Sequence, residues 1–183
     1  IDTDKELLSK ITDYCIEEPI SSADNTIEVQ LPFVKYFFPA AKICAFRSPC
    51  TEKAEELGKK CSIAVSELNR NAVYIGSLDL THYGSRYGFT PKGSGRNSLE
   101  WVKNENDQGF IQKVLSFDAS GAINHALNNQ SSCSPGPAAS VIGAIKNISE
   151  NAKANLIEYC TSADVMPDSN FVGYAGIVFE ILN

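Results

Sequence analysis

Apolar residues recur at helical spacing along much of this 183-residue sequence, and this pattern predicts a series of amphipathic helices. The clearest helix begins after Thr51, a residue type that favours helix N-termini, and continues to Leu68. Further helices are predicted over residues 5–15, 27–38, 109–116, 119–128 and 137–148. Asp118 and Pro137 suit the N-termini of the last two, as a capping side chain and a first helical residue.

Shorter apolar runs between these helices predict β-strands, over residues 42–47, 72–80, 154–161 and 171–182. Strands that alternate with helices indicate an α/β fold, with a mostly parallel, mixed sheet covered by helices on both faces. Residues 72–80 and 171–182 form long apolar runs, so we expect them to be central strands. The loop between the last two strands is too short for a crossover helix, so that pair is expected to be antiparallel or separated in the sheet.

Length and charge narrow the possible classes of protein. A chain of 183 residues is the size of one domain, and we expect residues 1–183 to form a single one. The net charge of −6 and a pI near 4.9 argue against a nucleic-acid or anionic-membrane partner. No apolar run approaches the roughly 20 residues of a membrane span, and the first residues do not resemble a signal peptide. These features predict a cytoplasmic protein that is processed at Ile1 or is part of a longer chain.

The six cysteines are expected to be reduced. They are scattered through predicted helices and strands, and no pair has the C-x-x-C spacing of a zinc knuckle or a thioredoxin-type site. A chain of this size can form a core without covalent cross-links. We therefore predict no disulfide bonds.

The segment that follows predicted strand 72–80 is the richest in chemically active side chains. Asp79 and His82 lie where that strand ends, which is where α/β proteins place their sites. A histidine there can bind a metal or transfer a proton, or it can be a turn histidine that is hydrogen-bonded to Asp79. The other histidine, His125, lies off the apolar face of its helix and is expected to be a surface residue.

Cys133 is the third candidate, in the loop before the helix that begins at Pro137. The positive end of that helix could favour a thiolate, or Cys133 could be a half-buried structural cysteine. A Cys-His-Asp hydrolase made from Cys133, His82 and Asp79 ranks last, because no nucleophile elbow supports it. Residues 93–97 superficially suggest a phosphate loop, but they lack a preceding strand and a third glycine.

Several segments occur together in an order that resembles one family. They are Ile27-Glu-Val-Gln-Leu-Pro-Phe, Ser77-Leu-Asp-Leu-Thr-His-Tyr-Gly-Ser-Arg-Tyr-Gly-Phe, Cys133-Ser-Pro-Gly-Pro and Phe171-Val-Gly-Tyr-Ala-Gly-Ile. Together they resemble the Memo-like family, called AmmeMemoRadiSam system protein B in many bacteria and archaea. That family is similar in fold to the class III (LigB-type) extradiol dioxygenases.

The resemblance implies a metal site of three histidines and one cysteine, of which His82 and Cys133 match two. The other two histidines belong to N-terminal motifs that this chain lacks, so its N-terminal part is expected to be missing. The chain also has Asn25, Leu78 and Ser134 where the family pattern has histidine, serine and glycine. The full family site would hold iron or copper, whereas this chain alone is expected to hold no fully ligated metal.

Two functions follow from the resemblance. The first is a metal-dependent oxidoreductase of dioxygenase type, with His82 and Asp79 at the catalytic site and His82 and Cys133 as metal ligands. The alternative is a non-catalytic interaction protein that binds a peptide or a small anion on the same scaffold. A small-molecule or peptide ligand is expected in either case, and exposed apolar surface could favour a homo-oligomer.

Overall fold

The computed structural model describes residues 1–11 and 25–182 of the chain. Its N-terminal part contains α1 (Lys5–Ser9), α2 (Asn25–Glu28), α3 (Leu31–Phe37) and α4 (Lys53–Glu67). The middle part contains β1 (His82–Tyr83), a 3-10 turn (Ser85–Tyr87), α5 (Arg96–Trp101), a π-helical turn (Val102–Asn106), α6 (Asp107–Leu115) and α7 (Ala119–Asn129). The C-terminal part contains α8 (Gly136–Ile148), β2 (Ala152–Thr161), α9 (Ser162–Val165) and β3 (Phe171–Ile181).

In the second half of the chain, α6, α7 and α8 confirm the helices predicted from apolar periodicity. The Asp118 carboxylate accepts a hydrogen bond from the Gly121 backbone N–H at the start of α7, as expected for an N-cap. Pro137 lies in the first turn of α8, where its missing N–H leaves no helical bond unmade. Thr51 does not cap α4, which follows Glu52 without a side-chain cap. The predicted helix 27–38 is divided into α2 and α3, and the predicted helix 5–15 ends at Ser9 within the residues described.

The sheet differs from the prediction. Its order is β1-β3-β2, and both pairings are antiparallel, so a mostly parallel sheet is wrong for the described residues, although the α/β class is confirmed. Of the two arrangements expected for the last two strands, antiparallel or separated in the sheet, the antiparallel one is confirmed, because β2 and β3 pair along most of their length. The predicted strand 42–47 is reduced to a single bridge between Thr3 and Ile43.

Residues 72–80 form no strand, and the prediction of a central strand there is wrong. The segment is extended, but Val73 and Ile75 are 68% and 57% exposed. A strand requires hydrogen bonds to a neighbouring backbone, and none of the described residues offers one along 72–78. β3, by contrast, lies in the middle of the sheet as predicted.

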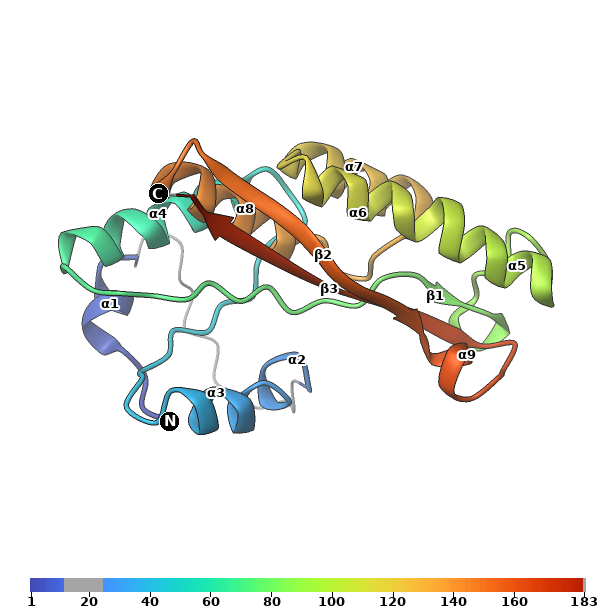
Figure 1. Cartoon of the computed structure of the whole chain (residues 1–183), viewed down its shortest axis with the longest axis horizontal. Helices are drawn as coiled ribbons and strands as arrows, with labels where there is room; N and C mark the ends of the chain where they lie inside the picture. Colours follow the sequence, from blue (N-terminus) through green and yellow to red (C-terminus); the bar gives the residue numbers. More distant parts are fainter. Residues whose placement is uncertain (12–24, 183) are drawn as a thin grey trace.

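Helices cover one face of the long β2–β3 ribbon (Figure 1). The main core lies between α6, α7, α8 and this ribbon, with Phe110, Ile111, Ile123 and Ile142 buried at its centre. The opposite face exposes apolar side chains such as Ile157, so the expected helical cover on both faces is absent from the part of the chain that the structure describes. A second cluster is built around Tyr83 and Phe171, whose rings stack 5.2 Å apart.

α4 and α8 pack closely through glycines. A side chain at Gly58 would lie 1.7 Å from the Ser140 carbonyl oxygen, and one at Gly143 would lie 2.1 Å from that of Glu55. Each helix thus presents bare backbone to the other, which fixes α8 and the loop that precedes it. None of the described helices is long and apolar enough to span a membrane.

Candidate metal site

Asp79, His82 and Cys133 come together at the junction between segment 72–80 and β1. One potential ligand atom from each lies within 4.8 Å of the other two. His82 and Cys133, which the family resemblance assigns to one metal site, therefore lie close together, and Asp79 joins them. The cluster combines an imidazole, a carboxylate and a thiol from two segments more than 50 residues apart in the sequence.

β3 holds the first of these two segments in place. The Leu80 N–H donates to the Gly173 carbonyl oxygen (3.0 Å), and the Gly173 N–H donates to the Thr81 carbonyl oxygen (3.0 Å). His82 then pairs with Val172 as the first residue of β1. Two residues thus lie opposite Gly173, an irregularity of the bulge type that re-aims neighbouring side chains and is common beside functional sites.

The loop before α8 attaches directly to the same point. The Asp79 carbonyl oxygen accepts hydrogen bonds from the Ser132 hydroxyl (2.8 Å) and the Cys133 backbone N–H (3.3 Å). These backbone contacts set the separation of the Asp79 and Cys133 side chains without using their ligand atoms. The cluster is therefore positioned before any ligand binds.

Within the cluster, Asp79 and His82 are hydrogen-bonded. His82 Nε2 lies 3.2 Å from Asp79 Oδ2, and the two side chains are 33% and 46% exposed. The Tyr87 ring packs against the imidazole with a centroid distance of 5.0 Å. A carboxylate bonded to one ring nitrogen orients the imidazole and selects its tautomer, and the other ring nitrogen remains for a metal or a proton.

Cys133 is exposed, so the alternative of a half-buried structural cysteine is wrong, but its surroundings do not favour a thiolate either. Partial desolvation raises the pKa of the thiol, and the negative charge of Asp79 raises it further. A hydrogen bond with the Asp79 backbone lowers the pKa but does not cancel these two effects. The net direction of the shift is therefore opposite to that expected for a thiolate before a helix start. A neutral thiol is a poor nucleophile, which counts against the hydrolase hypothesis, but a bound metal ion can still displace its proton.

The structure also contains a buried polar cluster that the sequence did not reveal. Asp107, fully buried at the start of α6, accepts hydrogen bonds from the Thr81 N–H (3.1 Å), the Thr81 hydroxyl and the Tyr159 hydroxyl (2.7 Å). Asn106 donates to the Thr81 hydroxyl (2.9 Å). The cluster anchors the residue between Leu80 and His82, so it supports the candidate site from inside the fold.

The titration of this cluster is governed by burial. Desolvation raises the pKa of Asp107 even though three donors favour its ionised form. The pKa of Tyr159 is raised strongly, by desolvation and by the neighbouring Asp107 carboxylate. Acidic residues at helix starts are usually exposed, so nothing in the local sequence distinguished Asp107.

His125 is half-buried, so its prediction as a surface residue is wrong. Its Nδ1 lies 2.8 Å from the hydroxyl of buried Ser131, and burial lowers its pKa, with a further contribution from Lys113. The five cysteines that the structure describes are free thiols, in agreement with the predicted absence of disulfides, and Cys15 lies outside the described residues.

The donor set of the cluster fits a transition metal. Imidazole and thiolate are ligands that iron, copper and zinc share, and a carboxylate oxygen suits iron and zinc. Three protein ligands would leave open positions, as in catalytic rather than structural metal centres. These features define an α/β protein with a His-Asp-Cys cluster suited to a transition metal.

Residues 1–178 match the family model described as Memo-like protein, and the chain belongs to this family. It is 34% identical over 181 residues to the MEMO1 family protein of Thermococcus onnurineus, which covers 94% of this chain and 61% of that relative. It is 33% identical over 182 residues to a MEMO1 family protein of Pyrococcus abyssi, covering 94% and 61%. The corresponding values for Methanosarcina mazei are 34% over 190 residues, 98% and 64%. The chain thus spans less than two thirds of the length of these relatives.

Proposed function

We propose that this Memo-like chain contributes His82, Cys133 and Asp79 to a metal site of an oxidoreductase related to the class III extradiol dioxygenases. The convergence of three different ligand types within 4.8 Å supports the proposal most directly. The metal would be iron or copper, ions that accept a thiolate and an imidazole together. A bound ion with open positions would supply Lewis-acid and redox chemistry.

The residues of the chain would act around such an ion. Cys133 would lose its proton when it coordinates the ion, and the hydrogen bonds of the Ser132 hydroxyl and the Cys133 N–H to the Asp79 carbonyl oxygen would keep its loop in place. His82 would bind the ion or move a proton, and its hydrogen bond to Asp79 would hold the ring in the orientation that either role requires. His82 and Asp79 therefore remain the proposed catalytic pair.

The chain would not supply the complete family site. Further histidine ligands would come from the part of the protein that the family pattern places N-terminal to these residues. We therefore expect this chain to bind metal more weakly than a longer relative does, because affinity falls with each missing ligand.

Anaerobic titration of the purified chain with Fe²⁺ and Cu⁺ tests the proposal. We expect binding of one ion per chain, and a loss of affinity of at least about tenfold in each of Asp79→Asn, His82→Ala and Cys133→Ala. Cys160→Ala and His125→Gln replace the same residue types elsewhere and should bind as the unmodified chain does. Equal losses in the controls, or none in the three site variants, would contradict the proposal.

The same titration distinguishes the proposed metal site from the alternative function. A non-catalytic interaction protein for a peptide or a small anion needs no metal ligands, so all variants should then show the same negligible binding of either ion. Fe²⁺ and Cu⁺ are thus sufficient probes before any substrate is known.

A further inference from the structure

β3 has an edge that is only partly paired. Segment 72–80 and β1 follow this edge as far as Gly173, where the Leu80 and Thr81 backbones bond to it. At Asp79 the segment turns away, because its carbonyl oxygen bonds to the loop at residues 132–133 instead. Beyond Gly173 the two extended backbones diverge, and the rest of the β3 edge has no neighbour among the described residues.

The direction of the β3 backbone groups follows from alternation along a strand. The N–H and C=O of Gly173 point toward Leu80 and Thr81, and the Leu182 N–H points to the other side, to the Asn151 carbonyl oxygen (3.1 Å). Odd-numbered residues therefore face the open edge, and even-numbered residues face β2. Within the part of the chain that the structure describes, the backbone groups of Ala175, Ile177, Phe179 and Ile181 have no neighbouring strand at this edge.

Segment 72–78 forms the opposite wall. No backbone N–H or C=O in this segment is bonded to another backbone group of the described chain. The segment is held against α8, since a side chain at Gly76 would lie 2.9 Å from the Pro137 carbonyl oxygen. Among the described residues, it is therefore a second extended backbone whose N–H and C=O groups have no backbone partner.

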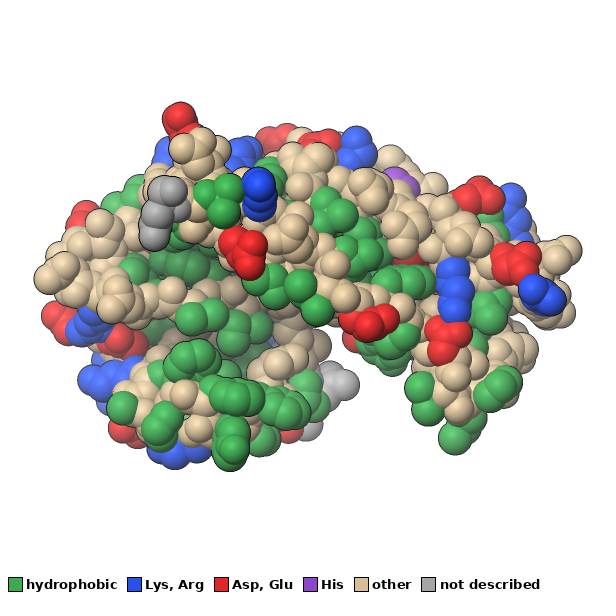
Figure 2. All heavy atoms as spheres, in the orientation of Figure 1, with side chains coloured by type: hydrophobic (Ala, Val, Ile, Leu, Met, Phe, Trp, Pro, Cys, Tyr) green, Lys and Arg blue, Asp and Glu red, His purple; other side chains and the backbone are tan. Residues whose placement is uncertain are grey.

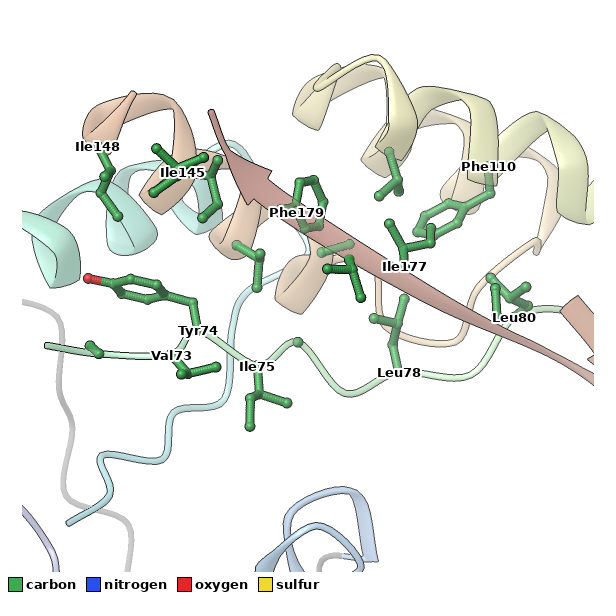
Figure 3. Close-up of a pocket in the computed structure, with 18 residues that line it drawn as sticks. Val73, Tyr74, Ile75, Leu78, Leu80, Phe110, Ile145, Ile148, Ile177 and Phe179 are labelled. Carbon is green, nitrogen blue, oxygen red and sulfur yellow. The ribbon is translucent and has the colours of Figure 1, made fainter. Parts of the chain in front are cut away.

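An apolar groove of about 500 Å³ lies between these two walls. Figure 3 shows Leu78 pointing from its segment toward the β3 ribbon, where Ile177 and Phe179 lie on the side of the helices, whereas Ile75 points away from the helices. Helix α8 adds Ile145 and Ile148 to the lining, and α6 adds Val114.

An apolar small molecule would fill such a groove but would leave both backbones unpaired. A β-strand would satisfy both requirements, because its backbone pairs with the walls and its side chains pack against apolar surface. Open apolar strand edges are avoided in folded proteins, which argues that this edge is covered in the complete molecule.

We propose that an extended, apolar strand pairs with Ala175, Ile177 and Phe179 of β3 and with segment 72–78, and that this strand belongs to the part of the Memo-like fold outside this chain. The relatives are long enough to contain such a strand, because more than a third of the Thermococcus onnurineus protein lies outside the match. Attachment within one polypeptide would hold the strand at high effective concentration. The inference goes beyond the proposed metal site and does not depend on it.

The test uses overlapping synthetic peptides of about 12 residues, long enough for one strand. They cover the part of the Thermococcus onnurineus relative outside the match, and they are added one at a time to the 183-residue chain in the presence of EDTA. Amide hydrogen exchange is followed by NMR. We expect one peptide, or two overlapping ones, to slow exchange at Ala175, Ile177 and Phe179 by at least about tenfold. The Val178 amide, which faces β2, should be slow from the start and unchanged.

Two variants at Ala175 test whether the peptide pairs with the open edge of β3. Ala175→Pro removes the N–H that faces the groove and keeps the bonds to β2, a position where edge strands tolerate proline. It should abolish the effect of the peptide, whereas Ala175→Thr should retain it. A slow Val178 amide in both variants verifies that the sheet is intact.

Two results would overturn the inference. One is that no peptide slows exchange at the odd-numbered β3 amides. The other is that these amides become slow in the chain alone as its concentration rises, which would assign the groove to a second copy. Loss of metal binding in the site variants would not affect either result, so the two proposals fail independently.

Discussion

Asp107 shows how a single buried residue can support a site it does not contact. Its carboxylate receives three hydrogen bonds from Thr81 and Tyr159 and has no positively charged partner in the hydrogen bonds described. Thr81 lies between the bulge at Leu80 and the candidate ligand His82. The carboxylate therefore holds the backbone where segment 72–80 passes into β1.

The raised pKa of Asp107 predicts a pH-dependent contribution to stability. In the folded chain the pKa of this carboxyl is higher than its unfolded value of about 3.9, so the group keeps its proton to a higher pH. Its contribution is therefore greatest at low pH and is lost as the pH rises through the folded pKa. In urea unfolding between pH 4 and pH 7, the unmodified chain should lose free energy of unfolding relative to Asp107→Asn. Other carboxyl groups are common to both proteins and cancel in the difference, so a pH-independent difference would contradict the prediction.

Asp118 stabilises the N-terminus of α7 as its capping residue. Its carboxylate accepts a bond from the Gly121 N–H at 2.8 Å. Asp118→Ala should lower the free energy of unfolding by about 1 kcal/mol. Asp118→Asn keeps the acceptor and should remain within a few tenths of a kcal/mol of the unmodified chain, because the exposed ion pair with Lys113 contributes little. Equal losses in the two variants would assign the effect to the charge instead.

At the scale of elements, the α4–α8 pair depends on close backbone contact. Glycine at positions 58 and 143 lets each helix approach the carbonyl groups of the other, near Ser140 and Glu55. This contact also fixes α8, whose preceding loop carries Cys133. The candidate site therefore depends on helix packing some distance away.

Added side chains should separate these helices. Gly58→Ala and Gly143→Ala should each lower the free energy of unfolding by about 1–3 kcal/mol, since a methyl group would overlap backbone atoms. Gly176→Ala is the matched control, because a side chain there meets no atom within 4 Å. Thermal or urea unfolding measures all three. If Gly58→Ala and Gly176→Ala had the same free energy of unfolding, the helices could move apart without loss of stability, and the prediction would be wrong.

At the scale of the whole molecule, a patch of large apolar side chains lies on α2, α3 and the residues beside them. Its exposed members are Val29, Phe33, Tyr36, Phe37 and Phe38. Figure 2 shows hydrophobic side chains gathered over this part of the surface, at the lower left. Apolar patches of this kind promote association between molecules, unlike single exposed apolar residues.

Charged substitutions in this patch should reduce self-association. Tyr36 is 79% exposed and Phe37 is 65% exposed, so Tyr36→Lys/Phe37→Lys should leave the free energy of unfolding within about 0.5 kcal/mol of the original value. Sedimentation velocity at rising concentration should show less association than for the unmodified chain. Leu127→Lys replaces an isolated exposed residue and should have little effect. A decrease of the same size in this control would implicate net charge rather than the patch.

The sequence by itself determined the features that depend on neighbouring residues. The helices α4, α6, α7 and α8 follow from apolar periodicity, and the cap at Asp118 follows from its side-chain oxygen and its place before an apolar face. The short spacing between Asp79 and His82 similarly permits the hydrogen bond that the structure contains. Cys133 was a candidate because of its place before a helix, but only family resemblance put it in one metal site with His82, since no local pattern links residues 79 and 133.

Only the tertiary structure decided which extended segments became strands and which polar groups were buried. Residues 72–80 and 171–182 have similar apolar character, yet only the second forms a strand, because a strand exists only when another backbone pairs with it. Asp107 carries no sign of burial in its own helix, and its environment is set by Thr81 and Tyr159 from other segments. Periodicity describes the residue and its near neighbours, whereas pairing and desolvation depend on partners that are distant in the chain.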